Sequence, residues 1–169
     1  MREFVLVFVC TGNICRSPMA EGIMKDIVLD EVDQLHRVIP ILISSAGTHA
    51  VTGSPASRYA VEVSKEHGIS LNFHRSKPIT EPIVRNADLI LTMEKNHTDF
   101  IKRNWSFCTT VFELKNFARE GSGRPLNSDI PDPIGMDIDV YVDVFDELYT
   151  EITRIANLVF SMAGKKSGN

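Results

Sequence analysis

The chain has 169 residues, of which 43% are hydrophobic, and its formal net charge is −4 at pH 7. That length suffices for one well-filled hydrophobic core and favours a single domain. The acidic balance gives no reason to expect a nucleic acid as a partner, and three cysteines are too few for a disulfide framework. We therefore expect a protein of the reducing cytoplasm, and no apolar stretch approaches the length of a membrane-spanning segment.

The first predicted strand is the apolar run at residues 4–9, which is rich in aromatic and β-branched side chains. Such a short, continuous run suits a central parallel strand that is covered on both faces. The run follows Met1-Arg2-Glu3, which has no net positive charge, so a core strand is favoured over the hydrophobic part of a signal peptide. A helix is then predicted at residues 18–29, because Ser17 offers an N-cap hydroxyl and Pro18 suits the first helical position.

Three further strands are predicted by short apolar runs at residues 38–43, 87–92 and 108–112. Pro40 in the first of them favours an edge position or the start of a strand, because proline cannot donate a ladder hydrogen bond. Strands that alternate with helices imply right-handed crossovers and a parallel sheet. We therefore predict an α/β fold, a three-layer sandwich in which helices cover both faces of a four-stranded parallel sheet.

The helices between these strands are predicted at residues 57–67, 80–86 and 94–104. A last, long helix is predicted because apolar residues recur at the spacing of one buried face. These residues are Tyr141, Val144, Phe145, Leu148, Ile152, Ile155 and Val159. Residues 1–163 are expected to form the single domain, and residues 164–169 a flexible tail.

The loop after the first strand carries the residues that point to chemistry. A loop that turns into a helix N-terminus directs backbone N–H groups inward and forms an anion cradle. Cys10 at its rim would be stabilised as a thiolate by those donors and by Arg16, whose guanidinium can hold two phosphate oxygens. The sulfur would then attack phosphorus in line and form a cysteinyl phosphate. Cys10 could instead simply end a core strand, but its spacing from Gly12, Arg16 and Ser17 favours the catalytic interpretation.

Residues 9–21, VCTGNICRSPMAE, closely resemble the signature of the low-molecular-weight protein-tyrosine phosphatases. The resemblance extends over nearly the whole chain, and it implies the strand order 2-1-3-4 when strands are numbered along the chain. It also implies a phosphatase that hydrolyses phosphomonoesters in proteins, most often phosphotyrosine, and releases inorganic phosphate. The phosphate-binding residues implied by this resemblance are Thr11, Gly12, Asn13, Ile14, Cys15 and Arg16.

A long connection at residues 116–135, rich in Gly, Pro, Ser and Asp, is expected to be functional because of its length. Breaking a phosphate ester requires a proton for the leaving oxygen, so a carboxylic acid must lie above the anion cradle. Asp132-Pro133 resembles the Asp-Pro element that carries the general acid in this family, and the proline stiffens the backbone after the acid. A solvated loop aspartate is the other interpretation, and Asp129 could compete for the role.

Supporting residues can also be assigned. Ser17 could donate a hydrogen bond to the Cys10 sulfur, or it could only cap the helix. Asn13 is expected to hold the loop in a strained turn, and by resemblance its side chain would be tied to Ser45 and His74. Taken alone, His74 would more often be a surface histidine.

The other two cysteines are assigned different places. By resemblance, Cys15 is the second loop cysteine of the family, which can trap an oxidised Cys10 as a reversible disulfide. Cys108 lies at the start of a predicted strand and is expected to be structural. Two loop cysteines without a partner pair of histidines do not make a metal site, so we expect neither a metal nor a cofactor.

The expected substrate pocket departs from the tyrosine phosphatase pattern. Val51 and Ile134-Gly135 stand where the family places aromatic side chains that wall in the phenyl ring, although Tyr141 or Phe117 could supply a ring from elsewhere. Ile14 matches the tyrosine phosphatase branch, whereas the bacterial protein-arginine phosphatases, which this chain also resembles, have threonine there. A threonine hydroxyl could meet a polar guanidino substrate, while isoleucine offers only apolar contact.

Residues 129–151 contain eight acids and neither lysine nor arginine. We interpret them as a solvated helix face rather than as a surface that selects basic phosphosites.

The sequence thus predicts a phosphotyrosine phosphatase, with a protein-arginine phosphatase as the nearest alternative. An arsenate reductase on this fold would need further cysteines in a mobile segment. A catalytically silent phosphopeptide-binding module is the alternative of another class. The combination of Cys10, Arg16 and Asp132 argues against such a module.

Overall fold

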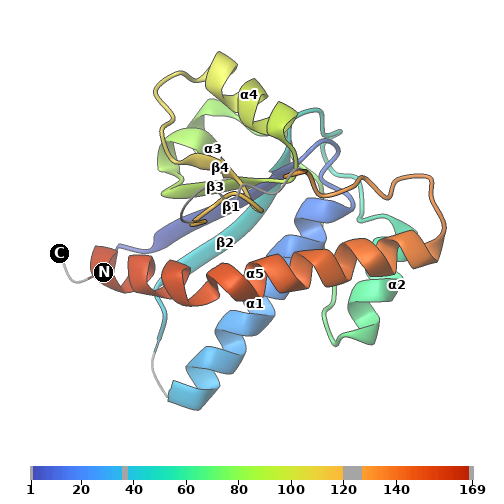
Figure 1. Cartoon of the computed structure of the whole chain (residues 1–169), viewed down its shortest axis with the longest axis horizontal. Helices are drawn as coiled ribbons and strands as arrows, with labels where there is room; N and C mark the ends of the chain where they lie inside the picture. The colour runs from blue at the N-terminus through green and yellow to red at the C-terminus, as the bar shows by residue number, and fades with distance from the viewer. Residues whose placement is uncertain (1, 36–37, 120–126, 168–169) are drawn as a thin grey trace.

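The computed structural model describes residues 2–35, 38–119 and 127–167. In these residues, four strands and five helices follow one another along the chain (Figure 1). They are β1 (Phe4–Cys10), α1 (Arg16–Leu35), β2 (Ile41–Gly47), α2 (Arg58–Glu66), α3 (Glu81–Asn86), β3 (Leu89–Thr92), α4 (Lys95–Asn104), β4 (Val111–Glu113) and α5 (Ile138–Ser167). Within the described ranges, no helix combines the length and the apolar character that crossing a membrane would need.

The sheet has the strand order β2-β1-β3-β4, and every neighbouring pair is parallel. This confirms the predicted α/β fold and its strand order. β2 lies at an edge, and Pro40 directly precedes it, as proline at a strand start predicts. Because the strands are parallel, their carboxyl ends meet at one edge of the sheet, toward the right in Figure 1. The loops that leave this edge are therefore brought together from distant parts of the sequence.

Helices α1, α2 and α5 cover one face of the sheet, and α3 and α4 cover the other (Figure 1). Successive residues of β1 serve the two faces in turn, with Leu6 and Phe8 in the larger core and Val7 and Val9 in the smaller one. This double burial explains why β1 reads as an uninterrupted apolar run. The predicted buried face of the last helix is confirmed, since all seven of its apolar residues are buried.

Several predicted element boundaries are wrong. β3 begins at Leu89 instead of residue 87, and β4 spans Val111–Glu113 instead of residues 108–112, because the Cys108 N–H donates to the Trp105 carbonyl oxygen in the turn after α4.

Helix α1 begins at Arg16 and runs to Leu35, so Ser17 lies inside the helix and is not its N-cap. The Ser17 hydroxyl instead lies 3.0 Å from the sulfur of Cys10. Strand β2 begins later than predicted and continues to Gly47, because its small polar residues pair in register beside the last residues of β1.

Helix α5 continues through Ser167, so residues 164–167 prolong the helix instead of starting a tail. Its carboxyl end lies beside the amino end of β1, since Lys166 Nζ is 6.0 Å from the ring centroid of Phe4. The same ammonium group pairs with Asp88. Residues 168–169 lie outside the described part of the chain, and the predicted flexibility of the tail stays a prediction.

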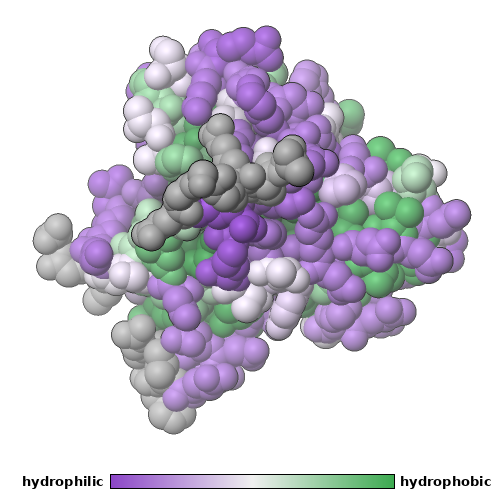
Figure 2. All heavy atoms as spheres, in the orientation of Figure 1, coloured by the Kyte–Doolittle hydropathy of each residue, from purple (hydrophilic) through white to green (hydrophobic). Residues whose placement is uncertain are grey.

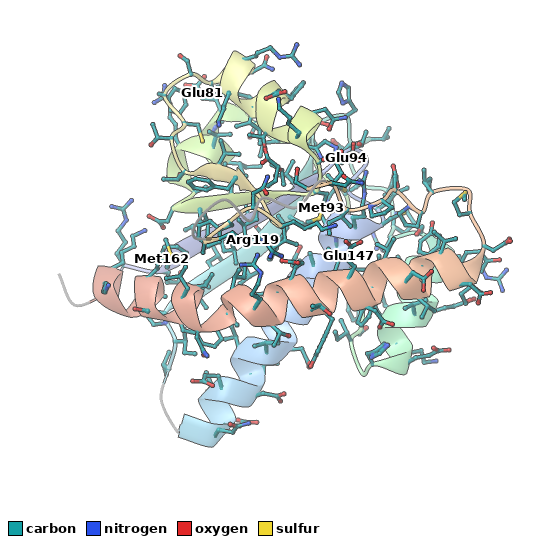
Figure 3. The ribbon with its side chains drawn as sticks, viewed as in Figure 1. Glu81, Met93, Glu94, Arg119, Glu147 and Met162 are labelled. Atoms are coloured by element: carbon teal, nitrogen blue, oxygen red, sulfur yellow. The ribbon has the colours of Figure 1, made fainter. Side chains whose placement is uncertain are left out.

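The acidic stretch at residues 129–151 is only partly a solvated face. Glu151 is buried and pairs at 2.7 Å with both Arg119 and Arg154. Glu147 pairs with Lys115 (Figure 3 labels Arg119 and Glu147). The cations come from outside the stretch, which is why its own composition suggested a row of solvated acids.

Gly47 at the end of β2 allows the chain to approach the loop that follows β1. A Cβ at this position would lie 2.4 Å from the carbonyl oxygen of Thr11 and 3.0 Å from the backbone nitrogen of Asn13. Both contacts are with backbone atoms, which cannot rotate away. Gly164 in α5 provides a contrast, because an added Cβ there would meet nothing within 4 Å.

We expect Gly47→Ala to lower the free energy of unfolding by about 1–3 kcal/mol, because the added methyl group must displace the loop. Gly164→Ala should leave that free energy unchanged or raise it by up to about 1 kcal/mol, since alanine favours a helix. Urea unfolding of both variants measures the difference. Equal effects of the two substitutions would contradict the close approach at Gly47.

Candidate active site

Residues 11–15 form the loop between β1 and α1 at the carboxyl edge of the sheet. Within it, Asn13 has a left-handed backbone with φ of 55° and is completely buried. Its side-chain amide donates to the hydroxyls of Ser17 and Ser45, both at 2.9 Å, and its side-chain oxygen accepts from the backbone N–H of Lys77 at 2.9 Å. The predicted turn and the contact with Ser45 are confirmed. These three bonds offset the strain of a left-handed residue that is not glycine.

His74 also meets Asn13, but at a different atom from the one predicted. Its Nε2 lies 2.7 Å from the backbone carbonyl oxygen of Asn13, so the imidazole donates to the loop backbone. The side-chain amide of Asn13 could not serve, because both of its hydrogens are already donated to serines. His74 therefore fixes the peptide that follows the left-handed residue.

The network continues from Ser45 into helix α1. The Ser45 hydroxyl donates to a carboxylate oxygen of Glu21 at 2.6 Å, and the other oxygen pairs with Lys25 at 2.5 Å. Glu21 is the last residue of the signature string, yet its sequence position did not suggest this contact. It anchors the loop network to the first turns of α1.

Cys10 ends β1 with its sulfur surrounded by hydrogen-bond donors. The Asn13 backbone N–H lies 3.3 Å from the sulfur, and the Ser17 hydroxyl lies 3.0 Å from it. The Ser17 oxygen accepts from the Asn13 amide, so the Ser17 proton can be donated to the sulfur at 3.0 Å or to the carbonyl oxygen of Ala46 at 3.5 Å, and the sulfur is the nearer acceptor. The structure thus places Ser17 as a partner of the sulfur.

The loop encloses a cavity of about 190 Å³. It is lined by Cys10, Thr11, Gly12, Ile14, Cys15, Arg16, Asp132 and Ile134. Among the described residues, the backbone N–H groups of Gly12, Ile14 and Cys15 donate to no other group. The structure therefore brings the predicted nucleophile, cation and acid to one cavity beside unpaired backbone donors. That is the arrangement of an oxyanion site.

Arg16 is almost fully buried, with 1% of its surface exposed, and its guanidinium is held in one orientation. Nη1 donates to the carboxylate of Glu94 and, at 2.8 Å, to the carbonyl oxygen of Ile130. Nη2 lies 3.1 Å from a carboxylate oxygen of Asp132, while Nε has no partner among the described side chains and backbone. The edge formed by Nε and Nη2 is the edge that binds two oxygens of a phosphate side by side.

Asp132 and Asp129 occupy different environments. Asp132 lines the cavity, is 39% exposed in its side chain, and accepts from the backbone N–H of Ile134 at 3.2 Å. Asp129 instead accepts from the backbone N–H of Lys95 at 2.9 Å, at the start of α4. A carboxylate at that position serves a helix N-terminus. The structure therefore favours Asp132 over Asp129 as the candidate acid, and the catalytic role itself stays a prediction.

Two residues of the site were missed by sequence reasoning. Glu94, at the junction of β3 and α4 in Figure 3, is the carboxylate that pairs with Arg16. His97 is 2% exposed, and its Nε2 lies 2.8 Å from the hydroxyl oxygen of Thr11. Both follow β3 at the carboxyl edge that also holds Cys10. The rule that ligands bind at this edge was the signal that could have found them.

His97 is neutral at ordinary pH. Burial lowers its pKa from the usual 6.5 to about 4, and the neighbouring Arg16 acts in the same direction. The carboxylates of Glu94, Asp129 and Asp132 oppose the shift without overcoming it. Its Nδ1 is buried and has no hydrogen-bond partner among the described residues.

Cys15 is buried beside two hydroxyl groups. Its thiol donates to the Ser57 hydroxyl at 3.1 Å, and its sulfur lies 3.4 Å from the hydroxyl of Tyr141. Burial raises the pKa of Cys15, and burial together with the Cys15 contact raises the pKa of Tyr141 to about 12. Cys10 and Cys15 are both free thiols. The proposed redox pairing of the two stays a prediction.

Neither aromatic residue suggested as a substitute wall lines the cavity. Tyr141 is buried edge-on against Tyr59, with 5.5 Å between the ring centroids. Phe117 is buried against Phe112, with 5.4 Å between the ring centroids. The walls that the structure does provide are aliphatic, namely Ile14 and the half-exposed Ile134. Figure 2 shows apolar side chains gathered on the right of the molecule, where α5 begins. The 131–137 segment runs to the same side in Figure 1.

No group of three or more histidine, cysteine, aspartate or glutamate side chains in the described ranges is arranged to hold a metal ion.

Comparison with known proteins gives consistent results. A family model described as low molecular weight phosphotyrosine protein phosphatase matches residues 5–165. A protein-arginine-phosphatase of Bacillus subtilis is 37% identical over 152 residues, which are 89% of this chain and 93% of that protein. A mutant YwlE arginine phosphatase with a phosphorylated active-site serine superposes with a TM-score of 0.82, at 35% identity over 92% of this chain and 95% of that one. A low molecular weight protein tyrosine phosphatase from T. tengcongensis superposes with a TM-score of 0.76, at 36% identity over 92% and 99%.

We expect the stability of the protein to fall as the pH is lowered from about 6.5 toward 4, in part because of His97. In that interval the unfolded chain binds a proton at this residue while the folded chain, with a pKa of about 4, does not. His97→Gln should therefore reduce the loss of unfolding free energy between pH 7 and pH 5 by about 2 kcal/mol. Urea unfolding at the two pH values measures it.

His49→Gln is the matched control, because the His49 ring is exposed. If the unfolding free energy of His97→Gln falls between pH 7 and pH 5 as much as that of the wild type, the buried imidazole does not resist protonation.

Proposed function

The chain belongs to the low molecular weight phosphotyrosine protein phosphatase family, and from that premise we propose that it hydrolyses phosphotyrosine in proteins through a cysteinyl-phosphate intermediate. One observation carries the proposal. Cys10, Arg16 and Asp132 line a single cavity of about 190 Å³, and within the described part of the chain the Arg16 guanidinium has an unpaired Nε and an Nη2 that meets only Asp132. Each of the three supplies one function that phosphate ester cleavage needs, namely a nucleophile, a charge for the phosphoryl oxygens and a proton.

In the first step the phosphoryl oxygens accept from the N–H groups of Gly12, Ile14 and Cys15 and from Nε and Nη2 of Arg16. Asp132, which pairs with Nη2 in the structure, gives up that contact when a phosphate oxygen takes it. The Cys10 thiolate then attacks phosphorus, the S–P bond forms as the ester P–O bond breaks, and protonated Asp132 gives its proton to the leaving oxygen.

In the second step a water molecule attacks phosphorus on the side that the leaving group has vacated. The Asp132 carboxylate takes a proton from this water as the new P–O bond forms and the S–P bond breaks. The Cys10 thiolate leaves, stabilised by the Ser17 hydroxyl and the Asn13 N–H. Inorganic phosphate is released, and the enzyme returns to its starting state.

The preference for phosphotyrosine rests on the walls of the cavity. Ile14 and Ile134 present aliphatic surface to the group that carries the phosphate, which suits a phenyl ring better than a charged guanidino group. Similarity to named proteins does not decide the question, because arginine phosphatases, at 35–38% identity, and tyrosine phosphatases, at 27–36% identity, both match over most of the chain.

A protein-arginine phosphatase is the second candidate, and one specific observation favours it. The two positions expected to hold an aromatic wall carry Val51 and Ile134 instead, and both are exposed. The cavity therefore lacks the stacking surface that strengthens binding of a phenyl ring.

The proposal extends to the setting of the reaction. The substrate is a phosphorylated protein, the product is inorganic phosphate, and neither a cofactor, a metal, a nucleic acid nor a membrane takes part. Residues 1–163, together with residues 164–167 that prolong α5, act as one phosphatase domain in the cytoplasm. Cys15 is proposed to protect an oxidised Cys10 by forming a reversible disulfide with it.

Asp132→Ala should slow hydrolysis of phenyl phosphate far more than hydrolysis of p-nitrophenyl phosphate, because a good leaving group needs no proton from the enzyme. We expect a loss in kcat of about 100-fold or more for phenyl phosphate and at most about tenfold for p-nitrophenyl phosphate. Asp129→Ala is the matched control, and its small effect should be equal for the two substrates. Equal losses in Asp132→Ala would mean that another group is the acid.

Matched phosphotyrosine and phosphoarginine peptides test the substrate directly. The wild type should have a higher kcat/KM on the phosphotyrosine peptide than on the phosphoarginine peptide. Ile14→Thr should lower the ratio of these two kcat/KM values by about tenfold, because a hydroxyl replaces an apolar contact. A wild type that prefers phosphoarginine would support the second candidate.

Cys10→Ser should abolish turnover of both peptides, and EDTA should change nothing. Failure to trap phosphate on Cys10 by acid quenching during turnover would contradict the proposed mechanism itself.

A further inference from the structure

His97, a buried histidine of α4, contacts Thr11 in the loop at residues 11–15. The side chain of Thr11 has so far been given no role. Nε2 of His97 lies 2.8 Å from the hydroxyl oxygen of Thr11, and His97 is 2% exposed. Thr11 is the residue directly after Cys10, and it lines the cavity in which the phosphoryl group is proposed to bind. His97 itself does not line that cavity. The imidazole therefore acts on Thr11 rather than on the substrate.

The surroundings of the ring decide which nitrogen carries the proton. His97 is neutral, because burial lowers its pKa to about 4, so only one of its two nitrogens is protonated. Nδ1 is buried without a partner in the described part of the chain. A proton on Nδ1 would be an unpaired buried donor, whereas a proton on Nε2 is donated to Thr11. The favoured tautomer thus makes His97 a donor and the Thr11 oxygen an acceptor.

A hydroxyl group that accepts one hydrogen bond still has a proton of its own to donate. Within the described residues, the Thr11 hydroxyl has no hydrogen-bond partner besides His97. Because the Nε2 proton occupies the side of the oxygen that faces the ring, the hydroxyl proton must point elsewhere. Thr11 lines the cavity, so a phosphoryl group bound there would lie beside this residue.

We infer that the Thr11 hydroxyl is a further phosphate-binding donor, and that His97 is the positioning residue that fixes it in this role. The inference rests on the proposed function, since it assigns a second contact to the same phosphoryl group. Thr11 thereby binds through its side chain, in addition to the backbone donors of the loop. An uncharged donor strengthens the site without adding a charge beside Arg16.

The charged groups near His97 are consistent with an Nε2–H donor that is present throughout the ordinary pH range. Arg16 disfavours a second proton on the ring, and Glu94, Asp129 and Asp132 favour one without outweighing burial. A protonated ring would still donate from Nε2, so the inference does not depend on a titration. What matters is the fixed N–H that holds the Thr11 oxygen.

Four single variants and one double variant test this inference with p-nitrophenyl phosphate as substrate and inorganic phosphate as inhibitor. Thr11→Val removes the hydroxyl and should lower kcat/KM and weaken phosphate inhibition by about tenfold each. His97→Leu should have a similar effect, and Thr11→Val/His97→Leu should be no worse than either single variant, because the two act as one unit. Thr11→Ser and His97→Gln keep a hydroxyl and a donor, and each should lose no more than about threefold.

Thr150→Val is the matched control for loss of a threonine hydroxyl. Thr150 lies on the exposed side of α5 and donates to the carbonyl oxygen of Asp146 at 2.9 Å. Its substitution should leave phosphate inhibition at the wild-type value, which separates loss of the Thr11 contact from a general effect of removing a hydroxyl.

Nuclear magnetic resonance gives a readout that a purely structural role would not produce. The ¹⁵N shifts of His97 in the wild type should show a protonated Nε2 and an unprotonated Nδ1. This measurement needs no variant, so it holds even if His97→Leu fails to fold.

Wild-type phosphate inhibition in Thr11→Val would overturn the inference, as would additive losses in the double variant or a proton on Nδ1. An inactive wild type that forms no cysteinyl phosphate would instead refute the proposed function.

Discussion

The burial of one positive charge governs the architecture of the site. The Arg16 side chain is almost wholly removed from water, so its charge must be balanced inside the protein. Glu94 and the carbonyl of Ile130 take one end of the guanidinium, and this fixes the direction of the opposite edge. The guanidinium is thus held in one orientation, as the proposed stabilisation of charge on a phosphoryl group requires, and only Asp132 has to move away from Nη2.

The fold supplies these partners by gathering loops at one edge of a parallel sheet. β1 delivers Cys10, β2 delivers Gly47 against the loop, and β3 delivers Glu94. Asn13 joins the first two by bonding Ser45 while it occupies a left-handed conformation. The loop is therefore supported from several elements, and no single helix or strand determines its shape. Its rigidity comes from hydrogen bonds that saturate one buried amide.

The sequence predicted those parts of the site whose physics is local. The turn at Asn13, the nucleophile Cys10 and the cation Arg16 fall within a few residues of one another, and the structure places them together as expected. Glu94 and His97 were missed because they lie 78 and 86 positions away from their partners Arg16 and Thr11. No local pattern reports a contact at that distance.

Other differences also arise from packing. The choice between Asp132 and Asp129 required knowing which carboxylate meets the start of α4. The contact between His74 and Asn13 was predicted at the Asn13 side chain, but it is made at the backbone carbonyl. The sequence could not show this, because both hydrogens of the Asn13 amide are donated to serines that only the structure reveals together. The strand order followed from resemblance, and spacing alone left several permutations open.

The contact between the end of α5 and the beginning of β1 has a consequence for how this protein can be rebuilt. Lys166 reaches Phe4 and Asp88 at the amino edge of the sheet, while the cavity opens at the carboxyl edge. Neighbouring chain ends can be joined by a short linker, and new ends can be opened in a surface loop, a rearrangement known as circular permutation. Because Phe4 and Lys166 lie at the edge of the sheet opposite the cavity, a connection made near these two residues would leave the contacts that shape the loop at residues 11–15 in place.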